Sequence, residues 1–185
     1  GEIGCYASHY TAWQRCVEFG EPLLIMEDDV QLDSRFPDAA AQAEHIIDRC
    51  RLLRLAALSE RRSLEQEELA GEYRLARLEK GGMGTQCYAL SPEGARVLLA
   101  HSNIWTAPVD YFLDAFWRHG LLSYALLPYR VSHIESGNNA TDIGERQSYG
   151  PGGLSDYRRH WSKQRDWALR KVYNLTHRRS ALHPS

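Results

Sequence analysis

The chain has 185 residues, a length that suits one α/β domain with a buried core. Its formal net charge of −2 at pH 7 gives no general attraction for nucleic acid, and we expect no nucleic-acid partner. No run reaches the roughly 18 apolar residues of a membrane span, which argues against an integral membrane protein.

Cysteine usage indicates a reducing compartment. The four cysteines lie far apart in the sequence, at Cys5, Cys16, Cys50 and Cys87. They form no C-x-x-C pair, and we find no histidine at ligand spacing, so we predict free thiols rather than a metal knuckle or a redox pair. Free thiols, together with the lack of a signal peptide in these residues, predict a cytoplasmic location.

The first elements are a helix and a short strand. Residues 3–19 place apolar side chains at helical spacing, and Gly20 followed by Pro22 ends the pattern. The apolar run over residues 23–26 fits a strand buried on both faces, as in a parallel or mixed sheet covered by helices.

The middle of the chain alternates between helices and strands, which is typical of an α/β fold. In chain order we predict a helix over 37–49, strands over 52–55, 73–78 and 85–90, helices over 91–100 and 108–120, and a last strand over 122–127. Ser91 and Pro92 mark one helix start, as N-cap and first-turn residues. Residues 59–71 are charged with few apolar anchors, so we predict an exposed helical excursion or loop there.

Two segments follow the last predicted strand. Residues 132–153 are rich in Ser, Gly, Asn and Asp and predict a functional or flexible loop. Residues 154–179 predict a basic helix with apolar side chains sharing one side, namely Tyr157, Trp161, Ala168, Val172 and Leu175. Such a helix can lie on an anionic membrane surface; the alternative is a helix packed on the domain with its arginine side in solvent.

Three adjacent carboxylates, Glu27, Asp28 and Asp29, follow the first predicted strand. Open α/β sheets bind ligands at the carboxyl ends of their strands, and carboxylates there need a counter-charge. A divalent cation that holds a phosphate would supply it. Oxygen ligands favour Mg²⁺ or Mn²⁺ over zinc, for which we find no nearby histidine or cysteine. The alternative is a solvated acidic turn or a helix N-cap.

Three segments, residues 1–10, 24–30 and 108–113, together resemble glycosyltransferase family 25, the bacterial lipooligosaccharide galactosyltransferase group that includes collagen galactosyltransferase domains. The resemblance covers roughly residues 1–145. It implies an α/β nucleotide-sugar-binding sandwich of the glycosyltransferase-A type with a mixed central sheet, a UDP-sugar donor, Mn²⁺ dependence and inversion at the anomeric carbon. Family members begin about 50 residues earlier, so we expect the fold to lack its N-terminal strand-helix segment.

This resemblance divides the chain into two parts. Residues 1–153 are expected to form the catalytic domain, shortened at its N-terminus. Residues 154–185 are expected to form a basic amphipathic helix and tail.

The resemblance also assigns metal ligands. Asp29 is the first expected ligand, with Glu27 beside it, because alternate positions of an extended backbone point the same way while Asp28 points elsewhere. His133 resembles a third metal ligand in related enzymes. A surface histidine is the alternative for His133.

Asp110 matches the second acidic position of the family. Inversion needs a base on the acceptor hydroxyl, and a carboxylate with an oxygen within about 3 Å would serve. Asp114, one helical turn further on, is the reserve candidate. The alternative is that Asp110 only caps its helix.

Contacts with the donor are also implied by the resemblance, for Ser8, His9, Glu27, Asp28, Gly84, Thr85, Gln86 and Thr141. Thr141 lies in a segment that would fold over the diphosphate as a lid. Two alternatives stay open: Ser8 bonded to its own helix backbone, and a simple hairpin at the glycine-rich loop.

The function expected from these residues is transfer of a hexose, galactose in the first instance, from UDP to a lipooligosaccharide or lipopolysaccharide acceptor. Residues 154–179 would hold the enzyme at the inner face of the bacterial inner membrane. Two alternatives remain. One is a metal-dependent phosphoesterase, since acids at a strand end also serve two-metal phosphatases. The other is a non-catalytic module that binds a membrane surface.

Overall fold

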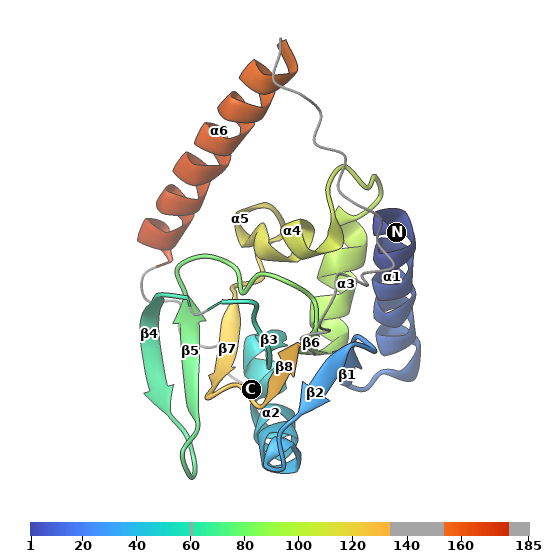
Figure 1. Cartoon of the computed structure of the whole chain (residues 1–185), viewed down its shortest axis with the longest axis vertical. Coiled ribbons are helices and arrows are strands. Elements are labelled where there is room, and N and C mark those ends of the chain that lie inside the picture. Colours follow the sequence, from blue (N-terminus) through green and yellow to red (C-terminus); the bar gives the residue numbers. More distant parts are fainter. Residues whose placement is uncertain (60, 134–153, 178–185) are drawn as a thin grey trace.

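A computed structural model describes residues 1–59, 61–133 and 154–177 (Figure 1). Its centre is a six-stranded sheet of order β1-β6-β3-β7-β5-β4, beside which β2 and β8 form a two-stranded sheet. The strands are β1 (Leu23–Met26), β2 (Val30–Leu32), β3 (Leu52–Arg54), β4 (Ser63–Glu68), β5 (Arg74–Leu78), β6 (Cys87–Leu90), β7 (Tyr124–Leu127) and β8 (Val131–His133). The pair β3–β7 is parallel and the other described pairs are antiparallel. The predicted α/β fold with a mixed central sheet is therefore confirmed.

Helices cover both faces of the sheet (Figure 1). On one face lie α1 (Glu2–Phe19), α3 (Pro92–His101), α4 (Val109–Asp114) and α5 (Phe116–His119), and on the other lies α2 (Phe36–Cys50). Side chains of β6 alternate between these layers, because successive residues of a strand point to opposite faces. Tyr88 packs with α1 and α3, whereas Ala89 packs with α2.

Helix ends follow the sequence signals. Gly20 ends α1 with a φ of 69°, the left-handed conformation that glycine adopts without strain. The hydroxyl of Ser91 accepts a hydrogen bond from the Gly94 N–H at 3.1 Å and so caps α3. Both predictions are confirmed.

The two edge strands of the large sheet differ from the predictions. β1 is half-exposed rather than buried on both faces, with Leu24 38% and Met26 42% exposed. It lies at the end of the strand order, beyond the strands on which α2 packs. At the opposite edge, residues 63–68 form β4 instead of the predicted helical excursion or loop. Backbone pairing with β5 holds this polar strand in place.

Later elements need three corrections. The helix predicted over 108–120 is broken at Ala115 into α4 and α5. The strand over 122–127 is not the last, because β8 follows it and pairs with β2. The glycine-rich loop over 81–84 does not close a hairpin, since β5 and β6 pair with other strands.

The predicted C-terminal helix is present as α6 (Leu154–Thr176), which extends away from the sheet in Figure 1. It packs on the domain through polar and aromatic side chains. Arg118 donates two hydrogen bonds to Asp166 at 2.9 and 3.0 Å, and Asn174 donates to the Glu79 carbonyl at 2.9 Å. Val172 and Leu175 are 58% and 62% exposed. The apolar side chains of the second half of the helix, Val172 and Leu175 among them, therefore face solvent.

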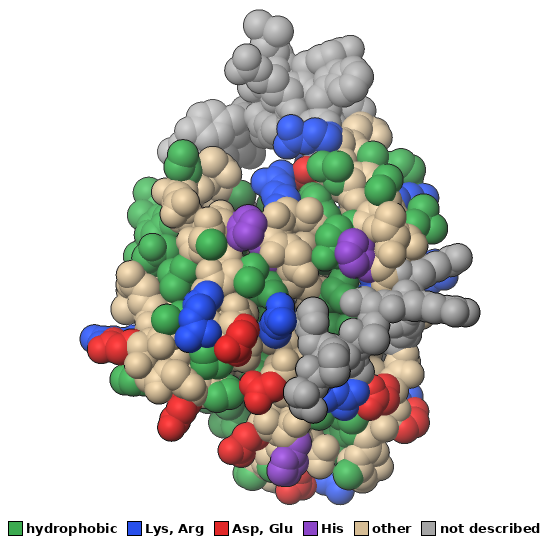
Figure 2. All heavy atoms as spheres, turned by 180° about the vertical axis from the view of Figure 1, so that it is seen from behind, with side chains coloured by type: hydrophobic (Ala, Val, Ile, Leu, Met, Phe, Trp, Pro, Cys, Tyr) green, Lys and Arg blue, Asp and Glu red, His purple; other side chains and the backbone are tan. Residues whose placement is uncertain are grey.

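Charged side chains of both signs occur together on the face of the molecule that Figure 2 shows. Figure 2 shows the face opposite to that of Figure 1, where acidic and basic side chains are intermingled on the lower half. The described part of this face therefore carries no patch of a single sign. In the described residues, no helix combines the length and apolar character that crossing a membrane requires.

Candidate functional site

The acidic triplet lies at a turn between the two sheets. The Glu27 N–H still donates to the Gln86 carbonyl at 3.0 Å, but residues 28–29 form a turn and β2 begins at Val30. The backbone is not extended through Asp29, so the alternation expected for a strand does not apply. Instead Glu27 contacts α1 while Asp29 contacts β8.

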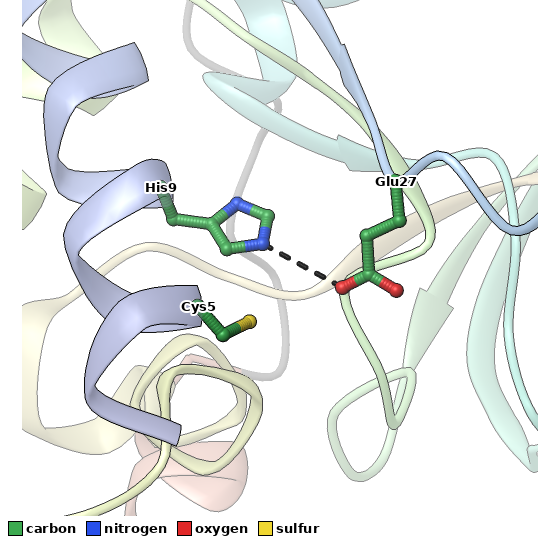
Figure 3. Close-up of side chains that lie close together, drawn as sticks. All are labelled: Cys5, His9 and Glu27. Atoms are coloured by element: carbon green, nitrogen blue, oxygen red, sulfur yellow. Dashed lines mark ion pairs between the residues drawn. The ribbon is translucent and has the colours of Figure 1, made fainter. Parts of the chain in front are cut away.

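Glu27 lies in a cluster with two residues of α1 (Figure 3). The side chains of Cys5 and His9 project from one face of α1 toward the carboxylate. His9 Nε2 lies 3.6 Å from Glu27 Oε1, and the Thr85 hydroxyl also donates to that oxygen. Glu27 is thus held by contacts with α1 and with the segment before β6.

The electrostatics of Glu27 follow from these contacts. Burial alone would raise the pKa of this carboxyl group, but hydrogen bonds from His9 and Thr85 outweigh it and lower the pKa below the ordinary 4.5. The charges of His9 and His133 act in the same direction. Glu27 is therefore ionised at neutral pH.

Asp29 pairs with the predicted third ligand. Pairing of β2 with β8 sets Val30 opposite His133, and this brings His133 Nε2 to 3.2 Å from Asp29 Oδ2. Adjacent ligands of an octahedral cation are about 3.0 Å apart when the bonds are about 2.1 Å long. Both side chains are partly exposed, at 50% and 39%, so an ion from solvent reaches them without unfolding. The pair fits two ligands of one hard cation.

Asp110 shares the neighbourhood of these acids. It is half-buried in the first turn of α4, where its Oδ1 accepts a hydrogen bond from the Tyr111 N–H at 2.8 Å. Burial raises the pKa of the Cys5 thiol, and the charges of Glu27, Asp110 and Asp29 raise it further. These three carboxylates therefore act on one region beside α1.

Asp114, the reserve candidate, serves to fix a loop. Its Oδ1 accepts from Arg54 at 2.9 Å and its Oδ2 accepts from the Met83 N–H at 3.0 Å. The Arg54 side chain is only 1% exposed and also donates to the Gly84 carbonyl. Burial raises the pKa of Asp114 despite the attraction of Arg54. Both carboxylate oxygens are thus engaged within the protein.

The glycine-rich loop needs its glycines. A Cβ on Gly81 would lie 1.9 Å from Asp114 Cγ, and Gly84 has a φ of 81°. The loop leads to Thr85 and Gln86, which are both buried. The Thr85 hydroxyl donates a hydrogen bond to the Glu27 carboxylate, and the Gln86 carbonyl accepts one from the Glu27 N–H. The glycines therefore allow the loop to pass close to Asp114, while the residues that follow it contact Glu27.

A groove of about 750 Å³ runs beside the small sheet. It lies between the β2–β8 sheet and the segment after β3, and its lining residues are Gln31, Leu32, Asp33, Ala56, Ala57, Leu58, Gln86, Tyr129, Arg130, Val131, Ser132 and His133. This volume is within the range of small-molecule sites. Gln86 and His133 connect the groove to both halves of the acidic triplet.

Three remaining candidates lie elsewhere or outside the described residues. Ser8 is exposed on α1, and its hydroxyl donates to the Gly4 carbonyl at 3.1 Å, which matches the backbone-bonded alternative. Asp28 is exposed in the turn. Thr141 lies outside the described residues.

Sequence reasoning missed Cys5 and Tyr88. Positions 5 and 9 are one helical turn apart, a spacing that puts two ligands on one helix face, so the statement that no histidine stands at ligand spacing is wrong. Tyr88 is fully buried; its hydroxyl lies 2.9 Å from His9 Nδ1 and accepts from Trp13 Nε1 at 2.9 Å. Tyr88 carried no sequence signal beyond that of a strand residue.

Residues 1–113 match the sequence profile of glycosyltransferase family 25, described as an LPS biosynthesis protein. The chain belongs to glycosyltransferase family 25. A bovine family-25 relative, "Probable inactive glycosyltransferase 25 family member 3", is 34% identical over 168 residues, which cover 82% of this chain and 28% of the relative. Human "Procollagen galactosyltransferase 2" is 29% identical over 130 residues, covering 67% of this chain and 21% of its own. A "Glycosyltransferase 25 family member" of Drosophila pseudoobscura pseudoobscura is 35% identical over 126 residues, which cover 64% of this chain and 20% of the relative.

The chain thus spans less than a third of the length of these family-25 relatives. They include a protein named as inactive and a galactosyltransferase.

Proposed function

We propose that this chain forms the metal-binding and catalytic part of an inverting glycosyltransferase that uses a UDP-hexose, with galactose as the first candidate. The observation that carries the proposal is the Asp29–His133 pair at 3.2 Å, beside a groove of small-molecule size. Family membership supports glycosyl transfer as the reaction class. A mixed sheet with acids after an edge strand supports a glycosyltransferase-A type of fold.

Asp29 and His133 would hold the cation, Mn²⁺ or Mg²⁺. A bound cation would neutralise the charge that develops on the UDP leaving group. Glu27 is engaged by His9 and Thr85, so we assign it to shaping the donor pocket and not to the same coordination shell. Gln86, which lines the groove, would also contact the donor.

Asp110 is the proposed base for the acceptor hydroxyl. It is half-buried and shares the region beside α1 with Glu27 and Asp29. Asp114 is a poorer candidate, because Arg54 and the Met83 N–H occupy both of its oxygens. Removal of a proton by Asp110 would leave the hydroxyl oxygen free to attack the anomeric carbon.

The acceptor we propose is the saccharide of a lipooligosaccharide or lipopolysaccharide, in line with the description of the family. A collagen-type acceptor, suggested by the name of the human relative, is the competing choice. The exposed apolar residues Val172 and Leu175 of α6 lie on the same helix as the basic residues Arg165 and Lys171. This combination of exposed apolar and basic side chains supports a lipid-linked acceptor. We propose that α6 contacts an anionic membrane surface, which for a cytoplasmic bacterial enzyme would be the inner leaflet.

The test is release of UDP from UDP-galactose in the presence of Mn²⁺ and a lipooligosaccharide acceptor. We expect acceptor-dependent turnover whose kcat falls at least a hundredfold in Asp110→Asn, with little change in the affinity for UDP. Full turnover by Asp110→Asn would remove the assigned base. Release of UMP and galactose 1-phosphate without any acceptor would favour the phosphoesterase alternative instead.

A further inference from the structure

Three potential ligand atoms meet beside α1. The Cys5 thiol, a ring nitrogen of His9 and a carboxylate oxygen of Glu27 all lie within 4.8 Å of one another (Figure 3). In the described residues this is the one group of three His, Cys, Asp or Glu side chains so arranged. The pair Asp29–His133 lies outside the group, so the two sets of ligands are separate.

The imidazole of His9 is already oriented for coordination. Its Nδ1 lies 2.9 Å from the Tyr88 hydroxyl oxygen, which leaves Nε2 directed at Glu27. A metal-binding histidine usually donates its other ring N–H to an oxygen acceptor, which fixes the ring. Tyr88 is fully buried and Trp13 also holds its oxygen, so this support is rigid.

The kind of ligands and their spacing select a particular class of ion. Sulfur, nitrogen and oxygen together suit zinc and similar borderline-soft cations, whereas Mn²⁺ and Mg²⁺ prefer oxygen. Ligand atoms of a tetrahedral zinc ion are about 3.4 to 3.6 Å apart. His9 Nε2 and Glu27 Oε1 are 3.6 Å apart, so this edge of the tetrahedron exists already. The Cys5 thiol lies within 4.8 Å of both atoms, so a rotation of its side chain toward them would complete the set of three ligands.

An ion also has a path to the cluster. Cys5 is the half-exposed member of the four free cysteines, whereas Cys16, Cys50 and Cys87 are buried. His9 is 5% exposed and forms the inner wall. Three protein ligands would leave the fourth position of a tetrahedral ion for water.

We propose that Cys5, His9 and Glu27 form a second metal site, specific for Zn²⁺-class cations and separate from Asp29 and His133. On coordination the Cys5 thiol loses its proton to solvent, and Nδ1 of His9 carries the ring proton and donates it to Tyr88. Glu27 turns from Thr85 to the ion. The site shares Glu27 with the proposed donor pocket, but the evidence for it does not depend on glycosyl transfer.

The experiment uses Co²⁺ as a spectroscopic substitute for Zn²⁺ on the whole chain. Thiolate ligation gives a charge-transfer absorption in the near ultraviolet, and we expect this band on addition of one equivalent of Co²⁺. Addition of Zn²⁺ should remove it. Titration of Zn²⁺ against a chromophoric chelator should show an affinity at least a hundredfold weaker in Cys5→Ser than in the unmodified protein.

Asp29→Asn is the matched control, because it alters the other pair of ligands. It should keep the Co²⁺ band and the Zn²⁺ affinity. A Co²⁺ spectrum without a thiolate band, or Zn²⁺ affinity unchanged in Cys5→Ser, would overturn the proposal. Loss of the band in Asp29→Asn would do the same, since it would place the ion at the neighbouring pair. None of these readouts depends on UDP-sugar turnover.

Discussion

Glu27 and Asp29 stand two positions apart, yet their side chains serve different partners. A turn at residues 28–29 sends Glu27 to His9 and Asp29 to His133. The sequence predicts these acids and His133 as one group of ligands, because the residue types alone indicate metal binding. It did not separate them into two sets, since the direction of a side chain after a strand depends on where the strand ends.

Cys5 illustrates the opposite error. Its spacing of four from His9 was present in the sequence, but an isolated cysteine and histidine on a helix are most often core residues. The third member of the cluster, Glu27, directly follows β1, and only the packing of α1 beside β1 brings it close. Clusters that join distant segments cannot be found by spacing alone.

His119 gives a prediction about acid stability. Burial lowers the pKa of this imidazole from 6.5 to about 4, and its Nδ1 accepts the Leu121 N–H at 3.2 Å. Between these two pH values the unfolded chain binds a proton that the folded protein does not. The stabilisation is complete above pH 6.5 and is lost as the pH falls toward 4. This lowering of the pKa of His119 corresponds to about 3 kcal/mol in the free energy of unfolding.

His119→Asn should therefore flatten the pH dependence of stability, since Asn keeps an acceptor for the Leu121 N–H without titrating. Urea unfolding at a series of pH values measures this. We expect the unmodified protein to lose about 3 kcal/mol more than the variant between pH 7 and pH 4. Parallel curves for the two proteins would contradict the assigned pKa.

At the scale of elements, helices were easier to predict than edge strands. Caps at Ser91 and Gly20 and the apolar stripe of α2 are local signals, and these elements are confirmed. β4 has a polar sequence without alternation, so only its pairing with β5 makes it a strand. β1 has the composition of a central strand but lies at an edge. Position in a sheet is a tertiary property, which composition does not report.

α6 carries the prediction at this scale. Its exposed apolar side and basic neighbours should bind anionic lipid, with each basic residue near the surface contributing about 1 kcal/mol. The double variant Val172→Glu, Leu175→Glu should bind phosphatidylglycerol vesicles at least tenfold more weakly in a sedimentation assay. Both side chains face solvent, so folding should be unaffected.

Ile104→Glu is the control for α6, because Ile104 is 79% exposed and lies in the segment between α3 and α4. It adds one charge and removes one exposed apolar side chain, and vesicle binding should stay near that of the unmodified protein. Equal binding by all three proteins would show that α6 takes no part. If the unmodified protein bound zwitterionic vesicles as tightly as anionic ones, the charge of the lipid would take no part in binding.

At the scale of the whole molecule, the sheet brings the site together from distant segments. β1 ends at the acidic turn, β6 follows the loop that approaches it, and β8 carries His133 back to Asp29. Family membership rests on residues 1–113, which include the first two of these elements. His133 lies beyond that match, and the pairing of β2 with β8 is what places it at the site.

The most direct test is a calorimetric titration of UDP into the chain with and without Mn²⁺, for the unmodified protein, Asp29→Asn and Glu21→Gln. Glu21 is an exposed acid before β1, so its variant matches the change in charge. We expect Mn²⁺ to tighten UDP binding at least tenfold in the unmodified protein and in Glu21→Gln, and to have no effect in Asp29→Asn. UDP binding that is equal with and without Mn²⁺, or undiminished in Asp29→Asn, would contradict the account.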